Sequence, residues 1–153
     1  MDIVDILVRL CAAMTAGGAL GLNRDLHGKP TGIRTLSLVA LGAALAVMAV
    51  MRAADVNAVS RVIQGILTGI GFLGAGVIVR TAEGEHVHGL TTAACVWLTA
   101  CVGVVCGVAE WQVIFVGLPL VFAILVWGGR IEKAIHRRLG GPDADVPPAD
   151  HPT

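Results

Sequence analysis

Two short polar runs in an otherwise apolar chain carry residue types that could bind an anion. Each run leads into an apolar segment of helical length, so free N–H groups and the positive dipole ends of two helices would lie beside Arg24 and Arg34. Helix capping by threonine and contact of arginine with lipid headgroups are the simpler alternative for the same pattern. The candidate functional residues in these runs are Asn23, Arg24, Asp25, Arg34, Thr35, Thr91 and Thr92.

Metal and acid–base chemistry have little support in the sequence. Mg²⁺ prefers hard oxygen ligands, yet the apolar segments after the first contain no Asp or Glu in their interiors. In the first segment, Asp5 precedes Arg9 by four residues, which predicts a structural ion pair on one helix face. No nucleophile, base and orienting group occur together. We therefore expect no catalytic residue, no metal site and no cofactor.

The segments that must position the polar runs have the length and composition of membrane-spanning helices. The 153-residue chain is 56% hydrophobic and 14% charged, whereas soluble domains carry about 25% charged residues. A spanning helix needs roughly 17 to 25 mostly apolar residues. Five segments qualify: residues 3–22, 35–51, 62–79, 90–109 and 111–128. We predict an all-α, polytopic membrane bundle of five transmembrane helices, with one transmembrane domain over residues 1–138.

The ends and loops of this bundle predict its orientation. Residues 139–153 are rich in Pro, Asp and Ala, which predicts a disordered tail. Of the eleven Lys and Arg residues, eight lie on one side of a five-span arrangement and three on the other. Because cytoplasmic loops are enriched in these residues, we expect the N-terminus outside and the C-terminal tail in the cytoplasm. Asp55 and Arg61 would then belong to an outer loop.

Glycine is densest in the third segment, residues 62–79. Small residues let helices approach closely in lipid. One helical face carries three glycines and another face carries two, which predicts neighbours on two sides and a central position for this helix. These helix-packing candidates are Gly65, Gly69, Gly71, Gly74 and Gly76.

A polar stripe also follows the third segment, where Gln64 and Thr68 share a face, and Cys95 and Thr99 form a similar stripe on the fourth. We expect that these two stripes could face each other. Interhelical hydrogen bonding is the simpler interpretation, at about 1 kcal/mol or less per bond. A substrate pathway is the alternative.

One internal similarity suggests a repeat. Residues 32–47 align with residues 89–104 at an offset of 57, which places Gly32 on Gly89 and Thr35 on Thr92. Each unit would hold two spans, so helices 1–2 and 3–4 would form a parallel repeat about an axis along the membrane normal. Chance alignment of small-residue helices is the alternative.

The runs GLNRD, GIRTLSLVALGAAL, SRVIQGILTGIGFLGAGVIV and HGLTTAACVWLTACVGVVCG occur in this order within residues 17–107. Together they resemble the MgtC/SapB family of bacterial inner-membrane proteins. Asn23 stands where the family usually has Glu, Asp25 shortens a second acidic residue, and the spacing from Asp55 to Arg61 is stretched. The resemblance implies a short form without the soluble C-terminal domain that some members carry.

This resemblance implies a non-enzymatic protein linked to Mg²⁺ homeostasis, growth at low Mg²⁺, stress survival or virulence. It would act in the lipid bilayer of the bacterial inner membrane through a partner such as the ATP synthase, or as a homo-oligomer or other membrane protein complex. No nucleic-acid partner is expected. The alternative is a small Mg²⁺ or proton transporter or channel. It predicts a polar cavity near Gln64, Thr68, Thr92 and Thr99.

Overall fold

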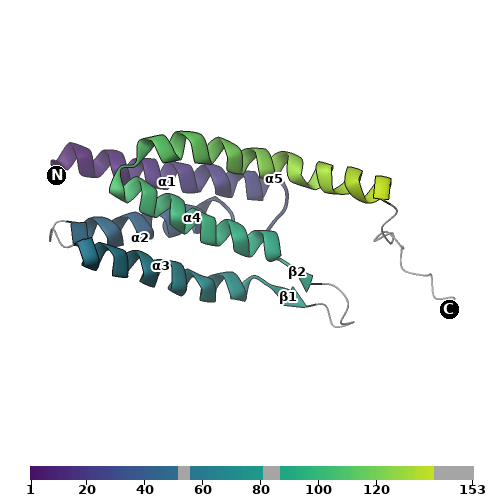
Figure 1. Ribbon diagram of the computed structural model, residues 1–153, viewed down its shortest axis with the longest axis horizontal. Coiled ribbons are helices and arrows are strands. Elements are labelled where there is room, and N and C mark those ends of the chain that lie inside the picture. Colours follow the sequence, from purple (N-terminus) through teal and green to yellow (C-terminus); the bar gives the residue numbers. More distant parts are fainter. Residues whose placement is uncertain (52–55, 81–86, 140–153) are drawn as a thin grey trace. The chain divides into compact units, whose positions relative to one another are not determined.

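The computed structural model of the protein describes residues 1–51, 56–80 and 87–139 (Figure 1). Its helices are α1 (Ile3–Leu26), α2 (Ile33–Met51), α3 (Val56–Gly76), α4 (Leu90–Val108) and α5 (Trp111–Leu139). Two short strands, β1 (Val79–Arg80) and β2 (Val87–His88), pair antiparallel between α3 and α4. The predictions made for Asp55 and for the tail after residue 139 lie outside the described residues.

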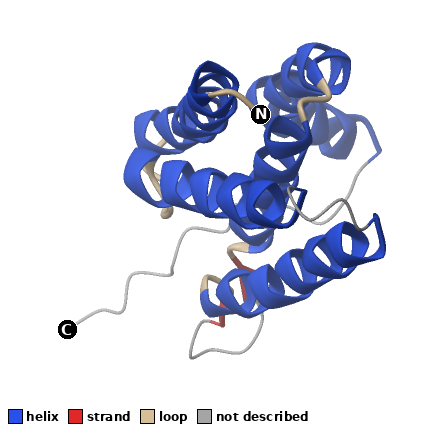
Figure 2. Cartoon of the chain, turned by 90° about the vertical axis from the view of Figure 1, so that its left-hand side faces the viewer, coloured by secondary structure: helices blue, strands red, loops and turns tan. Residues whose placement is uncertain are grey.

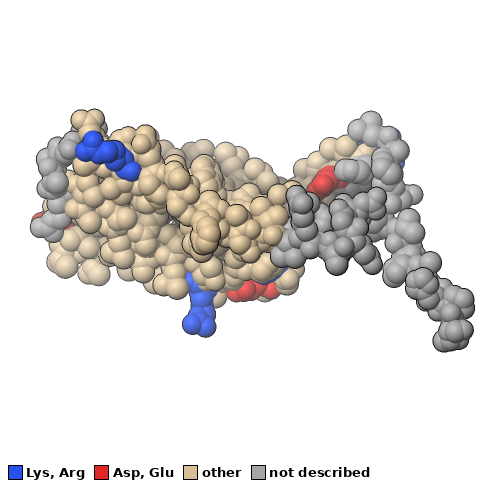
Figure 3. Space-filling view, turned by 90° about the horizontal axis from the view of Figure 1, so that it is seen from below, with Lys and Arg blue, Asp and Glu red and all other residues tan. Residues whose placement is uncertain are grey.

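All five helices are long and apolar enough to cross a membrane. Figure 2 shows the described chain as helices joined by short connections, apart from the small strand pair. Large apolar side chains are widely exposed, for example Phe72 at 82% and Leu38 at 68%. The surface in Figure 3 is correspondingly almost uncharged over much of the helical region. The predicted all-α membrane bundle of five spanning helices is confirmed.

The chain divides into two compact units within α5, residues Met1–Leu118 and Pro119–Thr153. Pro119 lies inside the helix, where proline lacks the N–H for a backbone hydrogen bond. In the second unit, the described residues continue α5 and carry exposed Arg130, Arg137 and Arg138 toward its end. The prediction of one transmembrane domain over residues 1–138 stays a prediction.

In the first unit, α2 and α4 are the central helices. Each contacts the other and also α1 and α3, and 33% of the spanning stretch of α2 and 50% of that of α4 is buried, compared with 11% for α3. The core joins Ala13 of α1, Ala40 and Ala44 of α2, and Cys106 of α4, all fully buried. The expectation that the third helix is central is therefore wrong within the single chain.

Close backbone approach explains how α2 packs between α1 and α4. A Cβ at Gly103 would collide with the carbonyl oxygen of Ala40, and a Cβ at Gly17 would collide with that of Leu36. Both glycines therefore let α2 lie directly against its neighbours, as small residues do in membrane helix pairs. Gly17-x-x-x-Gly21 in α1 and Gly103-x-x-x-Gly107 in α4 were the sequence signals for this packing.

Candidate functional site

At one end of the first unit, the C-terminus of α1 meets the N-terminus of α2. The backbone N–H of Ile33, the first residue of α2, donates a hydrogen bond of 2.9 Å to Oδ2 of Asp25. The carboxylate thus satisfies a free helix N–H and lies at the positive end of the helix dipole. A Cβ at Gly32 would collide with this carboxylate, so a larger residue there would displace the Asp25 side chain.

Arg24 extends from the last turn of α1 to the first turn of α4. Its Nη2 donates to Oγ1 of Thr92, and its Nε is buried without a hydrogen-bond partner. The residue is only 6% exposed. Within residues 1–51, 56–80 and 87–139, no carboxylate forms a salt bridge with it. The structure therefore buries a cation against a single neutral hydroxyl.

Among the described residues, no carboxylate caps the start of α4 as Asp25 caps α2. Its N-cap residue is Gly89, at φ 97°, which makes no side-chain cap bond. A Cβ on Gly89 would meet the backbone carbonyl of Val77, so this position needs glycine for both its conformation and its space. The first helical hydrogen bond of 2.8 Å runs from Ala93 N–H to the Gly89 carbonyl.

The other candidate residues of the two polar runs lie at or near the same helix ends. Asn23 is half-buried, and its backbone carbonyl oxygen lies 2.7 Å from Nδ1 of His27. Arg34, Thr35 and Thr91 are exposed at the helix starts. The structure thus brings Arg24 to Thr92 and Asp25 to the start of α2, and Gly32 and Gly89 each directly precede a helix. The internal repeat itself stays a prediction.

No hydrogen bond joins the two polar stripes among the described residues. The Thr99 hydroxyl is fully buried and donates at 2.7 Å to the Cys95 carbonyl of its own helix. Gln64 and Thr68 are exposed on α3. This difference arises because a Thr hydroxyl in a helix can bond to the carbonyl one turn earlier and so needs no second helix.

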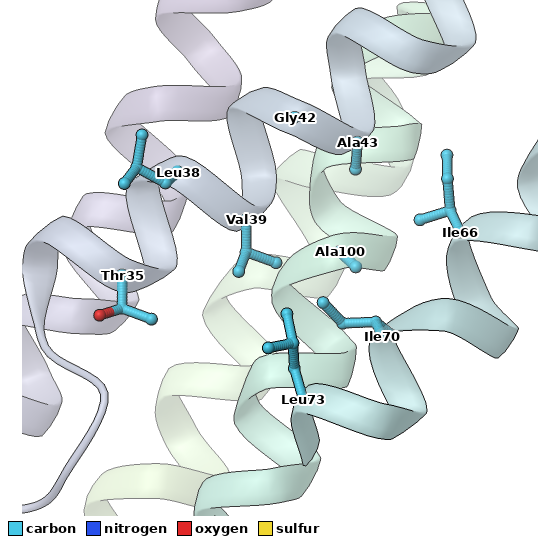
Figure 4. Close-up of a pocket in the computed structure, with 9 residues that line it drawn as sticks. All are labelled: Thr35, Leu38, Val39, Gly42, Ala43, Ile66, Ile70, Leu73 and Ala100. Carbon is cyan, nitrogen blue, oxygen red and sulfur yellow. The ribbon is translucent and has the colours of Figure 1, made fainter. Parts of the chain in front are cut away.

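Between α2, α3 and α4 lies an open groove of about 470 Å³ (Figure 4). Its lining is almost entirely apolar, and Thr35 is its one hydroxyl-bearing residue. The lining residues are Thr35, Leu38, Val39, Gly42, Ala43, Ile66, Ile70, Leu73 and Ala100. The polar cavity expected for a transporter is therefore not what this groove provides.

The glycines of α3 pack less closely than expected. A Cβ on Gly74 would lie 3.7 Å from the Ala93 Cβ of α4, which is ordinary contact. A Cβ on any of the other four would have nothing within 4 Å; these are Gly65, Gly69, Gly71 and Gly76. Their role in helix packing stays a prediction that now requires a second chain. Arg61 is exposed on the same helix.

At the opposite end of the first unit, Arg9 joins α1 to the C-terminus of α4. Its Nε bonds to Oδ1 of Asp5 at 2.8 Å, which confirms the predicted ion pair. Its Nη1 donates at 2.8 Å to the Gly107 carbonyl, a contact that the sequence did not reveal. Among the described residues, no group of three or more His, Cys, Asp or Glu side chains could hold a metal ion.

Comparisons with known proteins place this architecture in a family. The MgtC family profile matches residues 10–134. The chain is 44% identical over 128 residues to Protein SrpB of Synechococcus elongatus, covering 76% of this chain and 70% of that protein. It is 42% identical over 106 residues to Protein MgtC of Salmonella typhimurium, covering 69% of this chain and 45% of that protein. No solved structure matches the chain.

The chain is also similar to a second MgtC protein. The chain is 44% identical over 98 residues to Protein MgtC of Brucella abortus, covering 64% of this chain and 40% of that protein. The chain therefore spans less than half the length of these MgtC relatives. Its five spanning helices define a multi-pass α-helical membrane protein. The chain belongs to the MgtC family, as the resemblance of its motifs predicted.

Proposed function

We propose that this protein is a non-enzymatic inner-membrane protein that supports Mg²⁺ homeostasis, growth at low Mg²⁺ and stress survival or virulence through a membrane partner. Membership of the MgtC family is the observation that carries this proposal. The partner is a membrane complex such as the ATP synthase, or further copies of the chain. The N-terminus lies outside and the C-terminus in the cytoplasm, in keeping with the distribution of Lys and Arg.

The exposed face of α3 supports action through a partner. Gly65 and Gly69 are separated by one helical turn, and the space above both is open in the single chain. Glycines at this spacing let a second membrane helix approach closely. The neighbouring Phe72 is 82% exposed. We assign this face to contact with the partner.

Growth at low Mg²⁺ tests the proposal. In a bacterial host that lacks its MgtC-type protein, the wild-type chain should restore growth, and Gly69→Leu should abolish this rescue at equal membrane abundance. Gly117→Leu is the matched control, since a Cβ on Gly117 also meets nothing within 4 Å. Photocrosslinkers placed beside Gly69 should capture a membrane protein or a second copy of the chain.

Two results would contradict the proposal. One is rescue by Gly69→Leu equal to the wild type, which would exclude a partner contact on α3. The other is Mg²⁺ or proton flux through the purified protein in liposomes that Asp25→Ala or Arg34→Gln abolishes, which would establish the transporter alternative. A reporter fused to the C-terminus tests the orientation, because activity outside the cytoplasm would reverse it.

A further inference from the structure

The start of α4 combines two features that each favour a negative charge. The first-turn N–H groups of an α-helix have no partner within the helix, and the helix dipole places a partial positive charge there. The N-cap Gly89 offers no side chain to satisfy them. The guanidinium of Arg24 adds a full positive charge at the same turn through its bond to Thr92.

The burial of Arg24 makes this arrangement unfavourable in free energy when no anion is bound. A buried charge is normally paired and fully hydrogen-bonded. Arg24 is 6% exposed, its Nε has no partner, and no carboxylate among the described residues pairs with it. Asp25, the adjacent carboxylate, is bonded to the N–H of Ile33 at the start of α2. The described residues thus supply an anion to α2 and none to α4.

We propose that Arg24 and the N-terminus of α4 form a binding site for a phosphate group, supplied by inorganic phosphate or by the headgroup of an anionic phospholipid. A phosphate group has several acceptor oxygens, which suits a guanidinium together with backbone N–H groups. The Thr92 hydroxyl accepts from Arg24 and so keeps its own proton available for a phosphate oxygen.

The position of the site agrees with this chemistry. It lies where three spanning helices end or begin, since α1 ends at Leu26 and α2 and α4 start at Ile33 and Leu90. Lipid phosphates lie at this depth, and basic pockets between membrane helices bind such headgroups. Thr91 and Leu90 are exposed, the latter at 60%, whereas Thr92 is 3% exposed, so the start of α4 is open to the surroundings at its first two residues.

Ligand binding to the purified full-length chain tests the site. In a phosphate-free maltoside detergent, inorganic phosphate and phosphatidylglycerol are titrated separately, and the thermal midpoint of unfolding is followed because a bound ligand raises it. Native mass spectrometry then detects retained lipid. A response to phosphate alone identifies the free ion as the source, a response to phosphatidylglycerol alone identifies the headgroup, and no response to either overturns the proposal.

Substitutions test whether Arg24 and Thr92 are responsible for ligand binding. Arg24→Gln keeps a donor for Thr92 but removes the charge, and should lower the affinity about tenfold or more. Arg130→Gln is the control, since Arg130 is exposed on α5 and its loss should leave the affinity unchanged. If Arg24→Gln does not fold, Thr92→Val retains the arginine and should still weaken binding. Wild-type affinity in either folded variant would overturn the site. Low-Mg²⁺ rescue is a separate readout, so this inference and the proposed function can fail independently.

Discussion

Two arginines of α1 lie at opposite ends of α4, and their surroundings differ. Arg9 is at the C-terminus of α4, bonded at 2.8 Å to both the Asp5 carboxylate and the Gly107 carbonyl. Arg24 is at the N-terminus, and its one hydrogen bond within the described part of the chain runs from Nη2 to the Thr92 hydroxyl. A cation stabilises a helix C-terminus and destabilises an N-terminus. Among the described residues, the C-terminal end of α4 therefore has an arginine paired with a carboxylate, and the N-terminal end has an arginine without one.

The largest effect is expected at the C-terminal end of α4, where Arg9 is paired with Asp5. Arg9→Met should lower the free energy of unfolding by about 2 kcal/mol, because it removes charge-assisted hydrogen bonds to Asp5 and Gly107. The measurement is reversible unfolding in mixed detergent micelles. Asp5→Asn/Arg9→Met should recover part of the loss by removing the unpaired carboxylate. No loss for Arg9→Met would show that this end is not stabilised as described.

A smaller effect is expected where α1 supplies the anion for α2. Asp25→Ala should cost about 1 kcal/mol, the usual penalty for losing a helix cap. Asp2→Ala is the matched control, since Asp2 precedes α1 but makes no side-chain cap bond, and its effect should stay within about 0.5 kcal/mol. Equal losses for both variants would remove the assigned capping role.

The smallest effect is expected at the N-terminal end of α4, at Arg24, in the absence of a ligand. Arg24→Met should change the free energy of unfolding by about 1 kcal/mol or less, and in either direction, since replacing a buried unpaired charge by an apolar side chain is often neutral or favourable. The same unfolding assay in phosphate-free detergent measures it. A loss equal to that of Arg9→Met would erase the difference between the two ends.

Sequence reasoning predicted features that depend on composition or on neighbours along one helix. The five spans follow from apolar length, and the Asp5–Arg9 pair follows from its four-residue spacing. It could not predict that Arg24 contacts Thr92, because they lie 68 residues apart and meet only once α1 packs against α4. The glycines of α3 led to the wrong expectation of a central third helix, because small residues permit close packing without specifying which helix is the partner.

The contact from Arg24 to Thr92 also sets an order for assembly in the membrane. Since chains fold from the N-terminus during synthesis, α1 and α2 enter the bilayer while the arginine has no hydroxyl partner. Arrival of α4, 68 residues later, is the step that buries the charge. In a chain ending before α4, Arg24 would stay exposed at the end of α1 to water and lipid headgroups.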